Sequence, residues 1–414
     1  MRDPAGGRTA ARIEAMTPPG RDRGVDALRA LAIAGVVLGH WLVTAWVPGP
    51  RGTVAVSSPL AFMPELAPLS WVLQTLAVFF FVGGYAAARS LRTAGDRARA
   101  ETAGPARART DGPARAAAGP AWVRARMGRL LRPVGPLLLV WAGIAAGLAL
   151  HGAPYATVRA LALPALGPIW FLAVFAAFTA ATPLLLKLRP GVTAASAAAV
   201  VLAVDAVRFG LDGPAWLGWV NLAAGWLVPY VLGVGWAGGG LASRRTAVAL
   251  LAGGAAGAAV LVAGFGYPAS MVGVPGAGVS NLSPPTLAAV AFGLAQVGLA
   301  LLAHGPLGRL MRRPRLWAAV ALLNLSALTI LLWHLTVVAV TALAALRFGA
   351  VPGLLTPPAH LSWLPERLGW LPVFGGLLAL AGAAAKQWGR RLANRPSRGR
   401  PADGSTVRGS RPVL

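Results

Sequence analysis

The chain has 414 residues, of which 56% are hydrophobic and only 12% are charged, and its mean hydropathy is +0.64. This composition excludes a soluble globular protein, in which about a quarter of the residues are charged. The formal charge of +26 does not indicate nucleic-acid binding, because the arginines form short clusters between long apolar runs instead of one basic face. Lipid is therefore the main solvent of this chain, and the basic clusters mark its membrane topology.

Cysteine is absent, which excludes disulfides, thiolate metal sites and a cysteine nucleophile. The five histidines are dispersed and show no metal-ligand spacing; they are His40, His151, His304, His334 and His360. We therefore expect no metal and no permanently bound cofactor.

Ten apolar runs are each long enough to cross a bilayer, which takes roughly 20 residues per helix. We predict an all-α polytopic membrane protein with about ten transmembrane helices. The runs are centred near Val37, Val78, Val140, Phe178, Val201, Gly225, Ala256, Leu294, Leu331 and Leu378.

The distribution of basic residues predicts the orientation of these helices. If both termini are cytoplasmic, 33 of the 38 Lys and Arg residues lie inside. The other five fall in outside loops; they are Arg51, Arg159, Arg208, Arg347 and Arg367. This asymmetry follows the positive-inside rule, so we expect both ends of the chain in the cytoplasm.

Three segments are low in apolar residues and lack an apolar period, and we expect each of them to be disordered on the cytoplasmic side. They are the N-terminal tail 1–22, a loop at about 93–121 and a basic C-terminal tail 389–414. The remaining residues, 23–388, form the predicted membrane domain. Any chemistry of this chain is expected to lie there.

The first apolar run carries the most informative pair of polar residues. Arg29 and His40 are eleven positions apart, so at about 100° per residue they share one helix face. At about 1.5 Å per residue they are separated by about 16 Å, with Arg29 at the cytoplasmic boundary and His40 at or beyond mid-membrane. Asp26, three residues before Arg29, is the expected ion-pair partner of that arginine.

Each of these residues also has a structural interpretation. Arg29 alone is typical of a positive-inside anchor, and His40 alone is compatible with a packing role. His334, which follows a tryptophan inside another apolar run, is compatible either with the same cavity or with packing. Three arginines recur every three residues at a helix entrance, either as membrane anchors or as ligands for phosphate groups; they are Arg126, Arg129 and Arg132.

The sequence resembles the acyltransferase 3 family of membrane-bound acyltransferases, particularly its actinobacterial members. The first helix of that family carries an arginine, ten further residues and a histidine, as Arg29 and His40 do here. Further similar motifs follow in the same order: FFFVGGY (79–85), RARMGRLLRP (124–133), PIWFLAVF (168–175), GYPASMVGVPGAGVSNLSPPT (266–286) and LLWHLTVV (331–338). Many members have serine where this chain has Gly83, so no hydroxyl role is assigned there.

The resemblance implies an enzyme that moves an acyl group, often acetyl, from a cytoplasmic acyl-coenzyme A to a hydroxyl of a glycan, lipid or small molecule. It implies catalytic roles for His40 and Arg29, donor binding by Arg126, Arg129 and Arg132, and support from Asp26 and His334. His40 suits either a general base or a covalent acyl-histidine relay, and the sequence does not separate the two. The expected partners are acyl-coenzyme A, the acceptor and the bilayer, with no nucleic acid.

A second class of function also fits ten spans with few buried charges, namely a secondary transporter or exporter of a small molecule or a lipid-linked product. A transporter needs a pathway that opens alternately to both faces, whereas the enzyme needs a coenzyme A site at the cytoplasmic mouth. The Arg29 and His40 pair favours the enzyme. The Ala-, Gly- and Arg-rich composition indicates a bacterium of high GC content and hence its cytoplasmic membrane.

The charge distribution generates a test of topology. Alkaline phosphatase fused after Arg107 is expected to be inactive, because that loop is predicted to be cytoplasmic, whereas a fusion after Pro275 is expected to be active. Enzyme activity in intact cells measures both. An active fusion after Arg107, or a silent one after Pro275, would contradict the predicted helix count or orientation.

Overall fold

The computed structural model describes residues 4–102 and 111–393. Within these residues, ten helical segments are long and apolar enough to cross a membrane, and each of the ten predicted centres lies inside one of them. The segments are Arg23–Val43, Pro64–Ala100, Gly119–Leu150, Tyr155–Leu185, Pro190–Gly210, Ala215–Ala237, Arg244–Phe265, Leu287–Leu310, Ala327–Phe348 and Trp363–Ala384. The prediction of an all-α polytopic membrane protein is therefore confirmed.

The first half of the chain forms ten helices and one hairpin: α1 (Pro4–Ala15), α2 (Arg23–Val43), β1 (Ala45–Pro48), β2 (Val54–Ser57), α3 (Pro59–Phe62), α4 (Ala67–Leu73), α5 (Leu76–Thr102), α6 (Asp111–Leu131), α7 (Val134–Leu150), α8 (Tyr155–Leu166), α9 (Pro168–Leu185) and α10 (Pro190–Asp205). The second half forms α11 (Gly218–Ala237), α12 (Arg244–Phe265), α13 (Leu287–Leu310), α14 (Pro314–Leu325), α15 (Ala327–Ala345) and α16 (Trp363–Ala393). Short 3-10 or π turns cover Pro50–Gly52, Pro64–Leu66, Ala206–Gly210, Ala215–Leu217 and Leu346–Phe348.

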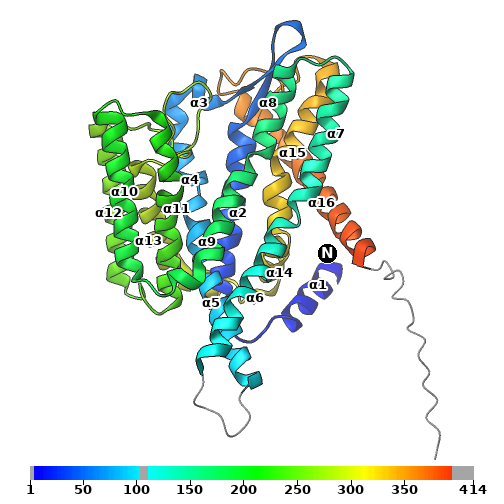
Figure 1. Cartoon of the computed structure of the whole chain (residues 1–414). Helices are drawn as coiled ribbons and strands as arrows, with labels where there is room; N and C mark the ends of the chain where they lie inside the picture. The colour runs from blue at the N-terminus through cyan, green and yellow to red at the C-terminus, as the bar shows by residue number, and fades with distance from the viewer. Residues whose placement is uncertain (1–3, 103–110, 394–414) are drawn as a thin grey trace, which may run out of the picture.

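The long helices run roughly along one axis (Figure 1). Helices α10 to α13 form a block on one side, and α7, α8, α15 and α16 lie on the other side, with α2 and α9 between them. Helix α2 contacts α5, α13, α14 and α15, so residues on α2 meet elements from both sides of the bundle. This central position is what allows the first helix to build a site with distant parts of the sequence.

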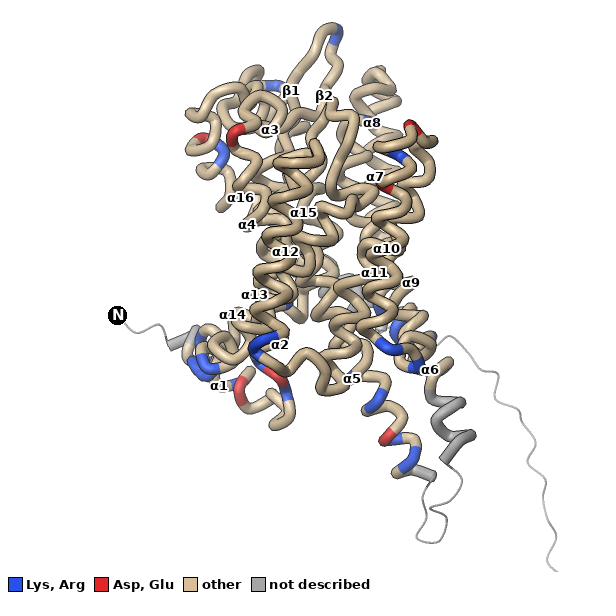
Figure 2. Tube along the Cα trace, turned by 90° about the vertical axis from the view of Figure 1, so that its left-hand side faces the viewer, with Lys and Arg blue, Asp and Glu red and all other residues tan. Residues whose placement is uncertain are grey.

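The two ends of the bundle differ in charge. Lys and Arg gather at the end where α1, α2, α5 and α6 lie, which we call the basic end, and the antiparallel β1–β2 hairpin projects from the opposite hairpin end (Figure 2). This arrangement is the one that the positive-inside rule produces. The assignment of the basic end to the cytoplasm stays a prediction.

Helix α2 begins with a polar cluster at the basic end. Asp22 caps the helix by accepting a hydrogen bond from the Val25 N–H, and it also contacts His304 Nε2 at 2.9 Å and the Tyr85 hydroxyl at 3.2 Å. Burial alone would raise the pKa of Asp22, but the hydrogen bonds with His304, Val25 and Tyr85 and the charge of His304 lower it to about 2. The carboxylate therefore stays ionised and holds α2 against α5 and α13.

A break separates α4 from α5 inside the second spanning segment, at Gln74 and Thr75. The freed backbone groups find partners, as they must where water is scarce. The Gln74 carbonyl accepts from the side chain of Gln296 on α13, and the Thr75 hydroxyl donates to the carbonyl of Ala32 on α2. The break is thus fixed to two neighbouring helices, and it leaves residues 73–76 lining an internal cavity.

Two of the segments expected to be disordered are helical over much of their described length. Residues 4–15 form α1, which packs against α14 at the basic end with Ala10 buried and Ile13 beside the cluster that contains Trp317, so the structure differs there from the predicted disordered tail over 1–22. The expected loop at 93–121 is helical over its described residues, because α5 continues to Thr102 and α6 begins at Asp111. Residues 103–110 and 394–414 lie outside the described part. The alternation of Ala and Arg that removes an apolar period is itself favourable to helix formation, which explains the difference.

Glycines allow the closest helix contacts. A Cβ built on Gly254 of α12 would meet the backbone of Ala295 and Ala291 on α13, whereas a Cβ on the adjacent Gly253 has open space within 4 Å. Helix interfaces in membranes depend on such small residues, because backbones then approach closely.

This contrast gives a matched pair of variants. Gly254→Leu is expected to destabilise the protein by about 1–3 kcal/mol or more, because the added side chain has to separate two packed backbones. Gly253→Leu should leave stability nearly unchanged. Thermal unfolding in detergent, followed by size-exclusion chromatography, measures both, and equal Tm values for the two variants would contradict the α12–α13 packing.

Candidate functional site

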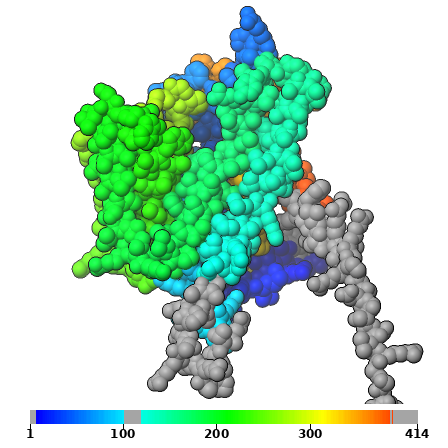
Figure 3. All heavy atoms as spheres, in the orientation of Figure 1, coloured from blue at the N-terminus to red at the C-terminus, as the bar shows by residue number. Residues whose placement is uncertain are grey.

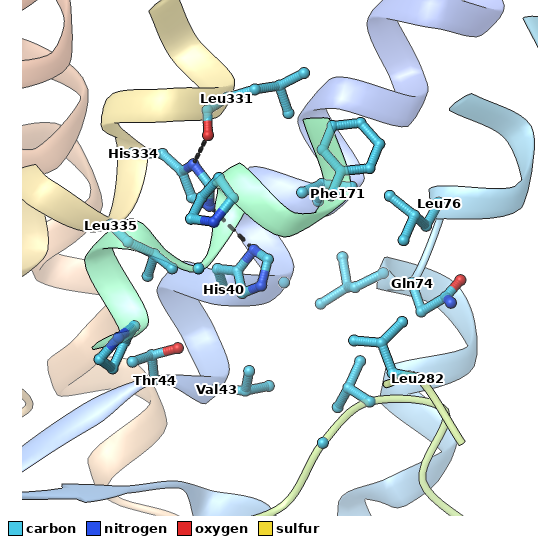
Figure 4. A pocket seen from close by; sticks show the side chains of 18 of the residues that line it. His40, Val43, Thr44, Gln74, Leu76, Phe171, Leu282, Leu331, His334 and Leu335 are labelled. Carbon is cyan, nitrogen blue, oxygen red and sulfur yellow. Dashed lines mark hydrogen bonds between the residues drawn. The ribbon is translucent and has the colours of Figure 1, made fainter. Parts of the chain in front are cut away.

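A pair of histidines lies near the hairpin end of α2. His40 Nδ1 is 3.0 Å from Nε2 of His334 on α15, and their ring centroids are 4.9 Å apart. His334 Nδ1 is 2.9 Å from the carbonyl oxygen of Leu331, one turn earlier on the same helix. Figure 4 shows this chain of contacts running from Leu331 through His334 to His40. Residues 294 positions apart in the sequence are thus brought into direct contact.

The hydrogen bonds assign the protons of the neutral pair. A carbonyl oxygen only accepts, so His334 Nδ1 carries a proton and donates to Leu331. In a neutral imidazole the other nitrogen is then an acceptor, so His334 Nε2 accepts a hydrogen bond that the Nδ1–H of His40 donates. His40 Nε2 therefore retains its lone pair. The geometry presents one basic nitrogen whose orientation is set by the partner ring.

Both histidines line a cavity of about 300 Å³. Its walls come from five places in the chain: the last turns of α2, β2, the α4–α5 break, the junction of α8 and α9, and the loop 272–282, with α15 closing it. Besides the two histidines, few polar side chains of the described residues line it, and none of these is charged: Thr44, Ser57, Gln74 and Thr75. Figure 3 shows a hollow on the face between the α10–α13 block and α8, with dark-blue atoms of the N-terminal part of the chain visible inside it.

One wall of the cavity is a loop that a buried carboxylate anchors. Asp205 at the end of α10 accepts from the Leu287 N–H at 2.7 Å, from Asn221 Nδ2 at 2.8 Å and from the Tyr267 hydroxyl at 3.1 Å. Burial and the neighbouring Asp205 carboxylate raise the pKa of Tyr267, so its hydroxyl stays protonated and continues to donate. These bonds hold both ends of the segment 267–286, from which Val272 and Pro275 reach the cavity.

A buried arginine supports the helix that carries His40. Arg367 on α16 is 0% exposed and donates to the carbonyl oxygens of Trp41 and Thr44, each at 2.6 Å. The Trp41 indole in turn donates to the carbonyl of His334 at 2.8 Å. The charge distribution predicts Arg367 in an outside loop, and this prediction is wrong, because Arg367 lies within the spanning segment of α16. A single arginine in the first turn of an apolar helix does not differ, in sequence, from a loop arginine.

Arg29 lies in the first turns of α2 at the basic end, whereas the cavity lies toward the opposite end of the same helix. Its Nη1 is 3.4 Å from Asp26 Oδ1, which is the expected i,i+3 pair. Asp26 is bound more closely by Arg21, whose Nε lies 2.6 Å from Oδ2. Within the described residues Asp26 is the one acceptor that the Arg29 side chain contacts, so most of this guanidinium remains available to another anion.

The arginines of α6 do not converge on one point. Arg126 is half-buried, its Nε has no hydrogen-bond partner in the described part of the chain, and its charge interacts with those of Arg129 and Arg29. Arg129 and Arg132 are exposed. A spacing of three residues falls short of a helical turn by about 60° at each step, so three such side chains spread around the helix. Of these three arginines of α6, Arg126 is therefore the one that we group with Arg29.

Gly83 of α5, where many similar sequences carry serine, lies against an aromatic ring. A Cβ at this position would collide with the ring of Phe175 on α9. Phe175 belongs to a cluster of rings that joins α5, α9 and α11 and includes Phe79, Phe80 and Tyr230. The ring occupies the space that a serine side chain would need, and glycine is the residue that fits.

Comparison with known families adds to this geometry. A family model described as an acyltransferase domain, that of the acyltransferase 3 family, matches residues 22–386. The match covers nearly the same residues as the predicted membrane domain, 23–388. No curated protein and no solved structure shows a significant match to the chain.

Proposed function

We propose that the chain moves an acyl group from acyl-coenzyme A to a hydroxyl. It belongs to the acyltransferase 3 family and is therefore an integral membrane acyltransferase. The observation that carries this proposal is the contact between His40 Nδ1 and His334 Nε2 at the wall of a cavity, from which we infer that His40 Nε2 keeps its lone pair. A histidine held in this way suits the removal of a proton from an attacking hydroxyl.

In the proposed reaction, the acceptor hydroxyl enters the cavity and attacks the thioester carbonyl carbon while His40 Nε2 takes its proton. The tetrahedral intermediate then expels the coenzyme A thiolate, which receives the proton from His40. His334 keeps Nδ1 of His40 engaged, so that Nε2 stays the basic nitrogen throughout. A covalent acyl-histidine route would use the same nitrogen, and both routes require the lone pair that this geometry provides.

The donor is proposed to bind at the basic end. Arg29 and Arg126 are cations that repel each other, and the buried Nε of Arg126 lacks a partner within the described residues. A phosphate group between them would relieve the repulsion and accept from both guanidinium groups. The phosphates of an acyl-coenzyme A supply such groups. Asp26 supports Arg29, and Arg129 and Arg132 provide the more exposed part of the same basic surface.

The acceptor is proposed to reach His40 from the hairpin end. The cavity is bounded there by β2 and by the loop 272–282, and no Asp, Glu, Lys or Arg of the described chain lines it. A charged group entering this cavity would lose its hydration without gaining a counter-charge. The part of the acceptor that carries the hydroxyl is therefore neutral, which fits a glycan, a lipid or a small alcohol and disfavours a phosphorylated sugar.

The bacterial cytoplasmic membrane is the proposed location, with the basic end and both termini inside, so the donor would bind from the cytoplasm. The Ala-, Gly- and Arg-rich composition and the charge asymmetry support this placement. A transporter is the less favoured function, because the matching family consists of acyl-transferring domains.

The central test uses His40 and His334. His40→Ala and His40→Gln are each expected to lower turnover by 10²-fold or more, because neither side chain serves as a base at neutral pH. His334→Gln should retain more activity than His334→Leu, because the amide oxygen can still accept from His40 Nδ1. Turnover is measured as coenzyme A released from acetyl-coenzyme A in proteoliposomes, with the acylated product of a neutral alcohol or glycoside identified by mass spectrometry.

Protein yield and the size-exclusion profile check that each of these variants folds. A well-folded His40→Gln that keeps more than about a tenth of wild-type turnover would contradict a general base at this position. The catalytic assignment would then pass to His334.

The donor site has its own matched pair. Arg126→Gln is expected to weaken the binding of a nonhydrolysable acetyl-coenzyme A analogue by about tenfold or more, because a half-buried charge-assisted contact is lost. Arg132→Gln removes the same charge from an exposed position and should change the Kd about twofold or less. Calorimetry in detergent measures both. Equal losses would indicate diffuse attraction instead of a site at Arg126, and no binding by the wild-type protein would favour the transporter.

A further inference from the structure

We propose that Arg367 is the positioning residue of the histidine pair, and that it keeps His40 both in place and unprotonated. This inference rests on the proposed role of His40 as a base. Arg367 lies in the first turns of α16, more than 300 residues after His40, and does not itself line the cavity. Its effect on the reaction therefore has to pass through the end of α2.

The guanidinium caps the last turn of α2. The Thr44 N–H closes that turn on the carbonyl of His40, and the next free carbonyls are taken by Arg367: Nε donates to Trp41 and Nη2 donates to Thr44. The remaining bond, from Nη1, goes to the carbonyl of Gly353 at 3.1 Å. A rigid planar fork meets three carbonyl oxygens from two segments, a geometry that the single ammonium of a lysine cannot reproduce.

Burying this charge is costly, which argues for a specific role. Arg367 is 0% exposed and has no carboxylate partner within the described residues. Its neighbours are aromatic faces, with the guanidinium carbon 5.4 Å from the Trp363 ring centre and 4.9 Å from that of Phe374. An apolar residue of similar size would fill the same space without the cost of desolvating a cation. Such a residue would not provide the two hydrogen bonds to the end of α2 or the third to Gly353.

Two routes connect Arg367 to the histidine pair. Through the backbone, it fixes the residues on either side of the turn that His40 closes. Through Trp41, whose carbonyl it binds, it fixes the indole that donates to the carbonyl of His334. The positions of both rings, and so the direction of the His40 Nδ1–H bond, depend on the same guanidinium.

The charge of Arg367 has a second effect. His40 lies in the last turn of α2, where the partial negative charge of a helix C-terminus stabilises an imidazolium. A cation bound to the terminal carbonyls offsets that partial charge and so favours the neutral, basic imidazole. The other titratable group facing His40 is His334 on α15. The described cavity residues from β2, α4, α5, α8, α9 and the loop 272–282 contribute none.

The experiment separates the two effects. Arg367→Met removes both the planar guanidinium and its charge. Turnover should therefore fall by 10- to 100-fold. The acidic limb of the pH profile of kcat/KM should also move to higher pH, by about half to one unit. Arg367→Lys keeps the charge without the fork, so turnover should fall while the acidic limb stays in place. Arg347→Met, which removes an exposed arginine, is the control and should match the wild type. All are assayed with acetyl-coenzyme A as the donor.

Trp41→Phe provides a second variant if Arg367→Met does not fold. It removes the indole donor to His334 but keeps an aromatic ring, and turnover should fall by about tenfold with little change in the KM for acetyl-coenzyme A. The proposal is overturned if folded Arg367→Met has the wild-type pH profile and turnover, or if Arg367→Lys moves the acidic limb as far as Arg367→Met does. A different result would contradict the proposed function, namely turnover that stays at the wild-type level when His40 is replaced.

Discussion

The apolar interior of the bundle is the constraint on which this structure depends, because a polar group there is costly unless it finds a partner. His40 finds His334, whose other nitrogen finds the carbonyl of Leu331. The break between α4 and α5 is held by its own Thr75 hydroxyl, which donates to α2, and by a glutamine side chain of α13, and the end of α2 is held by a guanidinium from α16. The bonds that satisfy these groups also fix the geometry of the cavity, so stability and site geometry have the same origin.

Charge is divided between the two ends of the bundle, and this division separates the proposed binding sites. Lys and Arg residues gather at the basic end (Figure 2), and the charges of Arg29 and Arg126 repel each other. The cavity at the opposite end has no charged lining in the described residues. Arg29 and His40 share a face of α2, and about 16 Å of helix separates them. In the proposed reaction, the coenzyme A phosphates stay at the first position while the thioester extends toward the second.

The sequence predicted those features that depend on local periodicity. The ten predicted apolar runs correspond to ten spanning segments, and Asp26 and Arg29 form the ion pair that their spacing predicts. It did not predict contacts that depend on how distant helices pack: the hydrogen bond between His40 and His334, or the cap that Arg367 places on α2. Helix α1 escaped detection for a different reason, since it has only 12 residues and is polar on average, so it does not stand out among apolar runs long enough to span a membrane.

The neutrality of the histidine pair has a chemical consequence. In many hydrolases a carboxylate orients the histidine and stabilises the imidazolium that forms, but a buried carboxylate is expensive in an apolar cavity. A second histidine fixes the tautomer at lower cost and adds no negative charge. The base then remains neutral at rest but receives less help when it takes a proton. Such a base suits a donor that is already activated, and a thioester, which has a good leaving group, meets this requirement better than an amide or a simple ester.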